Sequence, residues 1–119
     1  MRAGRKDSGG RYKKPKKRKL TGRAGQARIV KLGELKTKLL RGRGGSQKLV
    51  SFENDTINLK VKGKARVAKI KNVLETPSNT FLARQNILTK GSIVETDQGK
   101  AKITNRPSQE GNVQGILVE

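Results

Sequence analysis

The sequence predicts a mainly β protein, a small antiparallel barrel or sandwich with one short helix and a long, basic, extended N-terminal arm. Three observations predict this fold. Apolar and polar residues alternate with a period of two in several short runs between residues 49 and 118. Turn-forming residues separate these runs. In contrast, glycine and positive charge fill most of the first 27 residues.

The N-terminal segment, residues 1–27, has the composition of a disordered chain. It holds six apolar residues, three of them alanine. Such a segment cannot bury enough surface to offset the conformational entropy that it loses on ordering. We therefore expect residues 1–27 to be a basic extension that is disordered when free and orders only against a partner. Residues 28–119 are expected to form one β-rich globular domain with a modest core.

The predicted strands come from short alternating runs. In three runs, residues 57–62, 68–71 and 100–103, apolar residues alternate with polar residues that include two lysines each. Residues 49–52, 92–96 and 116–118 are predicted to be further strands, and Asp97-Gln98-Gly99 a three-residue hairpin loop with a left-handed glycine. Because alternate side chains of a strand share one face, the lysine pairs are expected to build a basic surface. The alternative is that they only solvate an exposed sheet face.

One segment predicts a helix instead. Pro77-Ser78-Asn79-Thr80 precedes a short helix expected over residues 81–85, with Ser78 or Asn79 as its N-cap. The three aromatic residues are Tyr12, Phe52 and Phe81, and both phenylalanines are expected to fill the core. So few aromatic side chains disfavour recognition of single strands by base stacking, and favour recognition of backbone and shape.

The net charge indicates a polyanionic partner. The chain has 29 Lys and Arg against 9 Asp and Glu, a formal charge of +20. Residues 1–50 carry 18 − 2 = +16 of it and residues 51–119 carry 11 − 7 = +4. Self-repulsion of this size opposes a compact fold unless a polyanion neutralises it. No apolar run approaches the roughly 18 residues of a membrane span, and no secretory signal is visible. We therefore expect an intracellular protein without a membrane partner.

Two basic clusters are the strongest local signals. Residues 13–19 are Lys or Arg except for Pro15, which blocks a helix, so this run is expected to be extended and to reach several phosphates. A nuclear import signal is an alternative reading of the same run. Residues 41–48 combine glycines, which allow close approach of the backbone, with arginines, which hold phosphate in a bidentate manner. This cluster lacks the Gly-Lys-Ser/Thr ending of a nucleotide-binding loop.

The composition also disfavours catalysis. The sequence has no cysteine and no histidine, which removes the commonest nucleophile–base pairs and transition-metal ligands. The carboxylate pairs Glu53/Asp55 and Glu95/Asp97 are too sparse for a two-metal site and are expected to cap turns and pair with lysines. We expect no enzyme activity, no cofactor, no metal site and no small-molecule substrate.

Four segments together carry a family resemblance. They are SGGRYKKPKKRK at 8–19, RGRGGSQK at 41–48, ETPSNTFLARQNILTKGSIVET at 75–96 and KITNRPSQEGNVQGILVE at 102–119. Over nearly its full length the chain resembles small-subunit ribosomal protein family eight of archaea and eukaryotes (S-eight-e), and most of all the archaeal form. The resemblance implies a structural component of the small ribosomal subunit, with a mostly β domain and an RNA-embedded arm.

The residues expected to bind RNA follow from these observations together. From the basic arm, which also resembles that of the family, the glycine-rich cluster and the strands, they are Gly9, Gly10, Arg11, Lys13, Lys14, Lys16, Lys17, Arg18, Lys19, Arg23, Arg41, Arg43, Gly44, Gly45, Lys48, Lys60 and Lys62. The resemblance adds Arg84, Lys90 and Arg106, and implies ribosomal RNA and neighbouring small-subunit proteins as partners. Net charge does not distinguish RNA from DNA, so a general DNA-binding or chromatin-type protein is an alternative. A small RNA-processing enzyme is a third.

Overall fold

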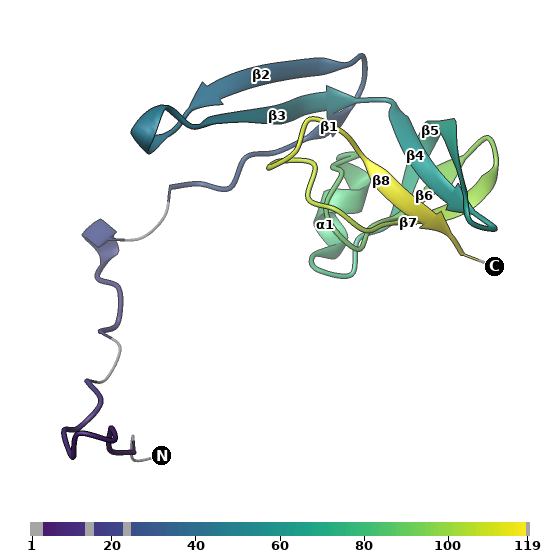
Figure 1. Ribbon diagram of the computed structural model, residues 1–119. Helices are drawn as coiled ribbons and strands as arrows, with labels where there is room; N and C mark the ends of the chain where they lie inside the picture. Colours follow the sequence, from purple (N-terminus) through teal and green to yellow (C-terminus); the bar gives the residue numbers. More distant parts are fainter. Residues whose placement is uncertain (1–3, 14–15, 23–24, 119) are drawn as a thin grey trace.

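The computed structural model describes residues 4–13, 16–22 and 25–118, and its dominant element is β-structure (Figure 1). The elements are β1 (Lys31–Leu32), β2 (Lys36–Arg41), β3 (Gln47–Asn54), β4 (Thr56–Val61), β5 (Lys64–Glu75), α1 (Thr80–Arg84), β6 (Ile93–Thr96), β7 (Gly99–Ile103) and β8 (Gln114–Leu117), with short 3₁₀ turns at Leu20–Gly22 and Arg43–Gly45. The prediction of a mainly β fold with one short helix is confirmed, and the choice between barrel and sandwich is settled as a barrel.

The barrel is closed by five strands in the order β4-β5-β6-β7-β8. Sequential neighbours pair in antiparallel fashion, whereas β4 and β8 pair in parallel, with Asn58 opposite Gln114 and Lys60 opposite Ile116. The predicted antiparallel pairing thus holds for the sequential neighbours, and only the closing pair is parallel. The reason is geometric: in an up-and-down array with an odd number of strands, the first and last strands run in the same direction.

The predicted alternation of the strands is confirmed in the barrel core. Ile57, Leu59, Ile70 and Ile103 are buried inside, at 0%, 0%, 6% and 1% exposure. The lysines that alternate with them are exposed. Burial of each such aliphatic side chain contributes about 1.5–3 kcal/mol. The barrel therefore supplies most of the stability of the fold and points its lysines at solvent.

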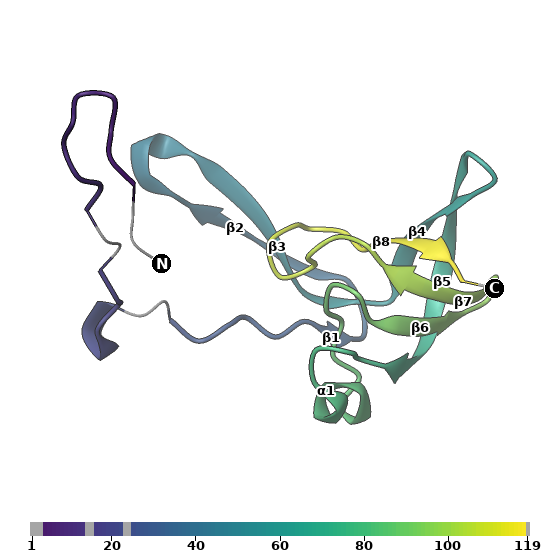
Figure 2. The same cartoon turned by 90° about the horizontal axis from the view of Figure 1, so that it is seen from below.

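A second, three-stranded sheet has the order β1-β3-β2 and contains a long hairpin, β2–β3. Figures 1 and 2 show this hairpin projecting from the barrel, with its tip far from α1. The sequence predicted part of β3 but not β2. Five of the six residues of β2 are exposed, so the strand has no buried face and its sequence, KTKLLR, carries no alternation of apolar and polar residues.

Two turns of the barrel differ from their predictions. Lys62 and Gly63 form the two-residue turn between β4 and β5, with φ of 46° and 81°, so Lys62 is not on a strand. Two consecutive residues of positive φ match the twist of a tight hairpin. Gly99 pairs with Thr96, so the loop between β6 and β7 has two residues and not three. The positive φ expected of Gly99 is present, at 119°.

The helix prediction is confirmed within one residue at each end. The side chain of Asn79 accepts a hydrogen bond from the Phe81 backbone N–H at 3.0 Å, which identifies Asn79 as the N-cap. The prediction that both phenylalanines fill the core is wrong for Phe81, which is 66% exposed. This five-residue helix turns Leu82 and Ala83 inward and leaves Phe81 outside. Phe52 is partly buried.

Every described residue between 4 and 27 is exposed. Within this segment the backbone forms an isolated bridge between Arg5 and Arg11. The boundary between arm and domain at residues 27 and 28, and the disorder of the free arm, remain predictions.

Candidate nucleic-acid interface

The glycine-rich basic cluster forms the tip of the β2–β3 hairpin. The backbone N–H of Gly42 donates to the Ser46 carbonyl at 2.6 Å and closes the loop. Gly44 and Gly45 have φ of 69° and 77°, a conformation that glycine adopts without strain. A side chain at Gly42 would meet Ser46 Oγ at 2.5 Å. The positive φ of Gly44 and Gly45 therefore favours glycine at these two positions, and both Arg41 and Arg43 are exposed.

The exposed cations of the tip are Arg41 and Arg43, whereas Lys48, also exposed, donates to Gln109 at the base of the hairpin. Both arginines lie beside a backbone with little side-chain bulk, because three of the five residues between Arg41 and Gln47 are glycine. A polyanion can approach such a backbone closely while arginine holds its phosphates in a bidentate manner. The structure thus brings together the predicted residues of this cluster on one projecting element.

The hairpin is braced against the barrel by the loop between β7 and β8. Lys48 Nζ donates to the side-chain oxygen of Gln109, and the Ser51 backbone N–H donates to the Pro107 carbonyl at 3.4 Å. Gly111 allows the closest approach, since a Cβ there would lie 2.3 Å from a methyl carbon of Leu49. These contacts hold the base of the hairpin, and the tip beyond them has no comparable support.

A further cation, Arg28, lies where the chain enters the barrel. Its Nη1 donates to the Ser108 carbonyl at 2.8 Å, and its guanidinium lies 5.8 Å from the centre of the Phe52 ring. A cavity of about 480 Å³ opens beside it, lined by residues 25–28, Arg106, Ser108 and Gln109. The sequence analysis predicted Arg106 but missed Arg28. Its only signal in the sequence was a positive charge at the expected start of the domain.

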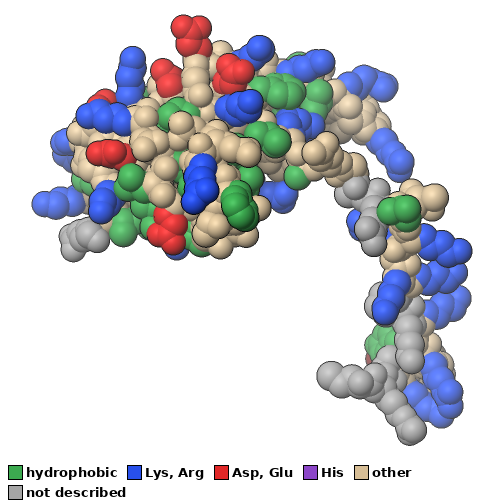
Figure 3. Space-filling view, turned by 180° about the vertical axis from the view of Figure 1, so that it is seen from behind, with side chains coloured by type: hydrophobic (Ala, Val, Ile, Leu, Met, Phe, Trp, Pro, Cys, Tyr) green, Lys and Arg blue, Asp and Glu red, His purple; other side chains and the backbone are tan. Residues whose placement is uncertain are grey.

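The β4–β5 hairpin of the barrel carries another group of cations. Lys60, Lys62, Lys64 and Arg66 are all exposed, and residues 60–66 contain no acid. The sequence analysis named the first two and missed Lys64 and Arg66, although their spacing of two continues the same pattern. Figure 3 shows lysine and arginine side chains over the globular part and along the arm, and most of the visible acidic side chains on the globular part.

The other predicted residues are distributed more widely. Arg84 ends α1, and Lys90 lies in the turn before β6; both are exposed but far from the hairpin tip (Figures 1 and 2). The described predicted residues of the arm are all exposed: Gly9, Gly10, Arg11, Lys13, Lys16, Lys17, Arg18 and Lys19. Lys14 and Arg23 lie outside the described residues. The predicted set is therefore spread over several faces and does not form one compact site.

The pairing of a turn carboxylate with a lysine, expected from the sequence, is observed for Asp97. Asp97 pairs with Lys71 at 3.1 Å, as expected for an acid at a turn. Within the described ranges, no group of three or more acidic, histidine or cysteine side chains could hold a metal ion. In the same ranges, no helix has the length and apolarity to cross a membrane.

Fold and charge together define a small, strongly basic β-barrel protein whose exposed cations extend onto a projecting hairpin and an arm. Comparison with known proteins gives the family. The chain belongs to the ribosomal protein S8e family, whose model matches residues 1–118. The resemblance stated from the sequence is confirmed.

Individual relatives agree with the family match. The small ribosomal subunit protein eS8 of Haloarcula marismortui is 39% identical over 119 residues, covering 99% of this chain and 96% of the relative. The protein of the same name from Pyrobaculum aerophilum is 39% identical over 121 residues, covering 97% and 91%. That of Nanoarchaeum equitans is 44% identical over 93 residues, covering 76% and 73%. The similarity to archaeal members is thus close to full length in two of the three.

Proposed function

We propose that this chain is a structural constituent of the small ribosomal subunit that binds and stabilises ribosomal RNA in the cytoplasm. The observation that carries the proposal is the grouping of exposed cations on the glycine-rich hairpin tip, Arg41 to Lys48, without an acid among them. Membership of the ribosomal protein S8e family supports it independently. Neighbouring small-subunit proteins are the further partners that this role implies.

The proposed mechanism is neutralisation of phosphates. Each lysine or arginine placed against a phosphate releases a condensed counterion, which favours binding and makes it depend on salt. The hairpin tip presents cations on a thin backbone, and the arm presents more of them along a chain whose described residues are exposed. A segment without a core of its own orders as it binds, so its affinity is reduced by the entropy of ordering.

The remaining parts of the proposal concern organisation and chemistry. Residues 1–27 act as the RNA-binding extension and residues 28–119 as the domain that fixes where the extension enters the RNA. The role is not catalytic, because the chain has neither histidine nor cysteine to supply a general base or nucleophile near neutral pH. It needs no cofactor, metal ion or small-molecule substrate.

Sedimentation tests this proposal directly. Tagged full-length protein from a cell lysate is run through a high-salt sucrose gradient, with and without ribonuclease. We expect stable co-migration with the small subunit, lost on digestion of the RNA. Migration at the top of the gradient, or with DNA, would instead support a general DNA-binding protein. Competition between duplex DNA and structured ribosomal RNA at matched salt separates these two roles a second time.

A further inference from the structure

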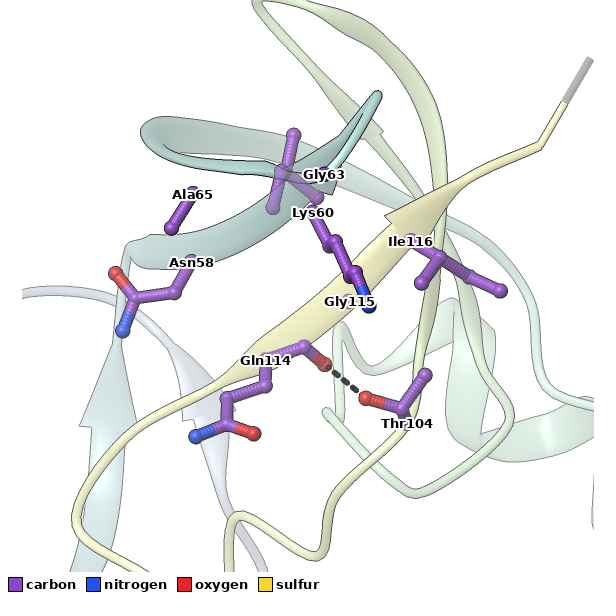
Figure 4. Close-up of a pocket in the computed structure, with 9 residues that line it drawn as sticks. Asn58, Lys60, Gly63, Ala65, Thr104, Gln114, Gly115 and Ile116 are labelled. Atoms are coloured by element: carbon purple, nitrogen blue, oxygen red, sulfur yellow. Dashed lines mark hydrogen bonds between the residues drawn. The ribbon is translucent and has the colours of Figure 1, made fainter.

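A groove lies on the outside of the barrel where β4 pairs in parallel with β8. It encloses about 690 Å³ and is lined by residues of β4, the β4–β5 turn, β5 and β8, together with Thr104 (Figure 4). Ala65 and Ile116 provide its exposed apolar side chains, whereas Leu59 and Gly115 are buried where they border it. The groove results from barrel closure, because it needs the β8 strand beside β4.

Two side-chain amides lie together at one end of this groove. The parallel register sets Asn58 opposite Gln114, and Figure 4 shows both side chains at the same end. The backbone N–H groups of both residues already have acceptors: that of Asn58 donates to the Val113 carbonyl and that of Gln114 to Asn105 Oδ1, both at 2.9 Å. Their side-chain amides make no hydrogen bond within the described residues and are exposed. Each therefore offers both donors and an acceptor to a ligand.

Positive charge flanks the same groove. Lys60, two residues after Asn58 on β4, lines it and extends across β8 beside Ile116 (Figure 4). Lys62, Lys64 and Arg66 follow on the adjoining hairpin but do not line the groove, and the register places Lys64 and Arg66 opposite Val61 and Leu59, on the other face from Lys60. No acid is among the lining residues, so the charge of Lys60 favours a phosphate-bearing ligand.

We propose that this groove holds one unpaired nucleotide of the bound RNA. The base lies on the apolar lining, its edge exchanges hydrogen bonds with the amides of Asn58 and Gln114, and a flanking phosphate meets Lys60. Splayed, unstacked bases are the part of RNA that proteins read by hydrogen bonding. The inference rests on the proposed function and deepens it, because it adds one point of base contact to a surface that otherwise meets only backbone.

The test uses the full-length chain labelled with ¹⁵N, and follows the side-chain amide signals of Asn58 and Gln114 in NMR titrations. The probes are a single-stranded RNA hexanucleotide, inorganic polyphosphate at matched charge, and a poly-glutamate peptide. We expect both amide signals to shift with the hexanucleotide and to stay in place with the other two probes. Equal shifts with polyphosphate would show a charge effect alone. Shifts with the peptide, or none with RNA, would also overturn the proposal.

Two double variants test the same site through their affinity for the hexanucleotide and for polyphosphate. Asn58→Ala with Gln114→Ala should weaken hexanucleotide binding about tenfold, the lower range for loss of a bidentate base contact, while polyphosphate affinity stays unchanged. The matched control, Gln85→Ala with Gln98→Ala, removes two exposed amides away from the groove and should change neither affinity by more than twofold. Equal losses in both double variants would exclude a specific nucleotide site.

The NMR titration and the sedimentation experiment test the nucleotide site and the ribosomal role separately. If the groove signals do not respond while the full chain still co-sediments with the small subunit, only the nucleotide site is wrong. If the signals respond while the chain does not co-sediment, the ribosomal role is wrong and the groove is a site for RNA in another setting.

Discussion

The chain before β4 and the barrel that follows it differ in buried hydrophobic residues and in net charge. Of the thirteen buried hydrophobic residues in the described chain, only Val30 and Val50 precede residue 56. Residues 1–50, in turn, carry +16 of the +20 net charge. Most side chains that stabilise the fold therefore lie in the barrel, and most of the net charge lies before it. Under the proposed function, changes in the barrel core should alter stability with little effect on RNA affinity, and removal of charges before β4 should do the reverse.

The outer part of the β2–β3 hairpin has little buried surface to stabilise it. Leu39 and Leu49 face each other across its strands, yet they are 55% and 48% exposed. A two-stranded hairpin without a buried face is marginally stable in water. Its base is supported by the loop between β7 and β8, but its tip is not. Under the proposed function, a bound RNA would supply the missing partner and would order the hairpin.

Deletion of residues 1–26 should have the largest effect on binding. It removes eleven lysines and arginines, and loss of several phosphate contacts is expected to weaken binding about a thousandfold at moderate salt. The thermal unfolding of the barrel should stay as it was. Fluorescence anisotropy with small-subunit ribosomal RNA at two salt concentrations measures the affinity and its salt dependence.

The control for this deletion keeps the length of the arm and removes its charge. Replacement of Lys16, Lys17, Arg18 and Lys19 by glutamine should reproduce a large part of the loss and lower the salt dependence. If the deletion variant bound RNA as tightly as the full chain at matched salt, the arm would not contribute to RNA binding as proposed.

A core substitution should show the opposite profile. Leu59→Ala removes a fully buried side chain of the barrel and should lower the free energy of unfolding by about 2–5 kcal/mol. Leu39→Ala on the exposed hairpin should lower it by at most about 0.5 kcal/mol. Urea denaturation of both variants measures the difference. Similar losses in the two would mean that the hairpin belongs to the same core as the barrel.

The hairpin tip should contribute less than the whole arm. Arg41→Ala with Arg43→Ala should weaken RNA binding about tenfold to a hundredfold and reduce the salt slope by about two, without a change in unfolding. The control double variant Lys69→Ala with Lys71→Ala removes two charges from the barrel, and we expect a loss of threefold or less. If the control lost as much affinity as the tip, charge would act uniformly over the surface.

The smallest effect is expected at the helix cap. Asn79→Ala should lower the free energy of unfolding by about 1 kcal/mol, because it leaves the Phe81 N–H without its acceptor. Ser78→Ala, the neighbouring candidate, should change it by a few tenths of a kcal/mol. Neither change should affect RNA affinity. A greater loss for Ser78→Ala would contradict the capping contact in the structure.

Local patterns in the sequence were sufficient for much of the fold. The alternation around Ile57 and Leu59 is a property of a strand with one buried face, and Asn79 before a helix is a property of neighbouring residues. The glycines between Arg41 and Gln47 likewise predicted a basic loop. The sequence did not predict β2, because this strand has no buried face and its apolar and polar residues therefore do not alternate. The prediction that Phe81 fills the core was wrong for a related reason, since hydrophobicity alone does not say which side of a short helix faces the barrel.

The sequence by itself determined the charge asymmetry, the period of the barrel strands and the lack of histidine and cysteine, because these depend on residue identity and on neighbours along the chain. Only the tertiary structure decided that β4 and β8 close the barrel in parallel, that the glycine-rich cluster sits on a projecting hairpin, and that Arg28 meets Phe52 and Ser108. These features depend on pairings between residues far apart in the sequence. Such pairings are selected by packing of the whole core, which no local pattern contains.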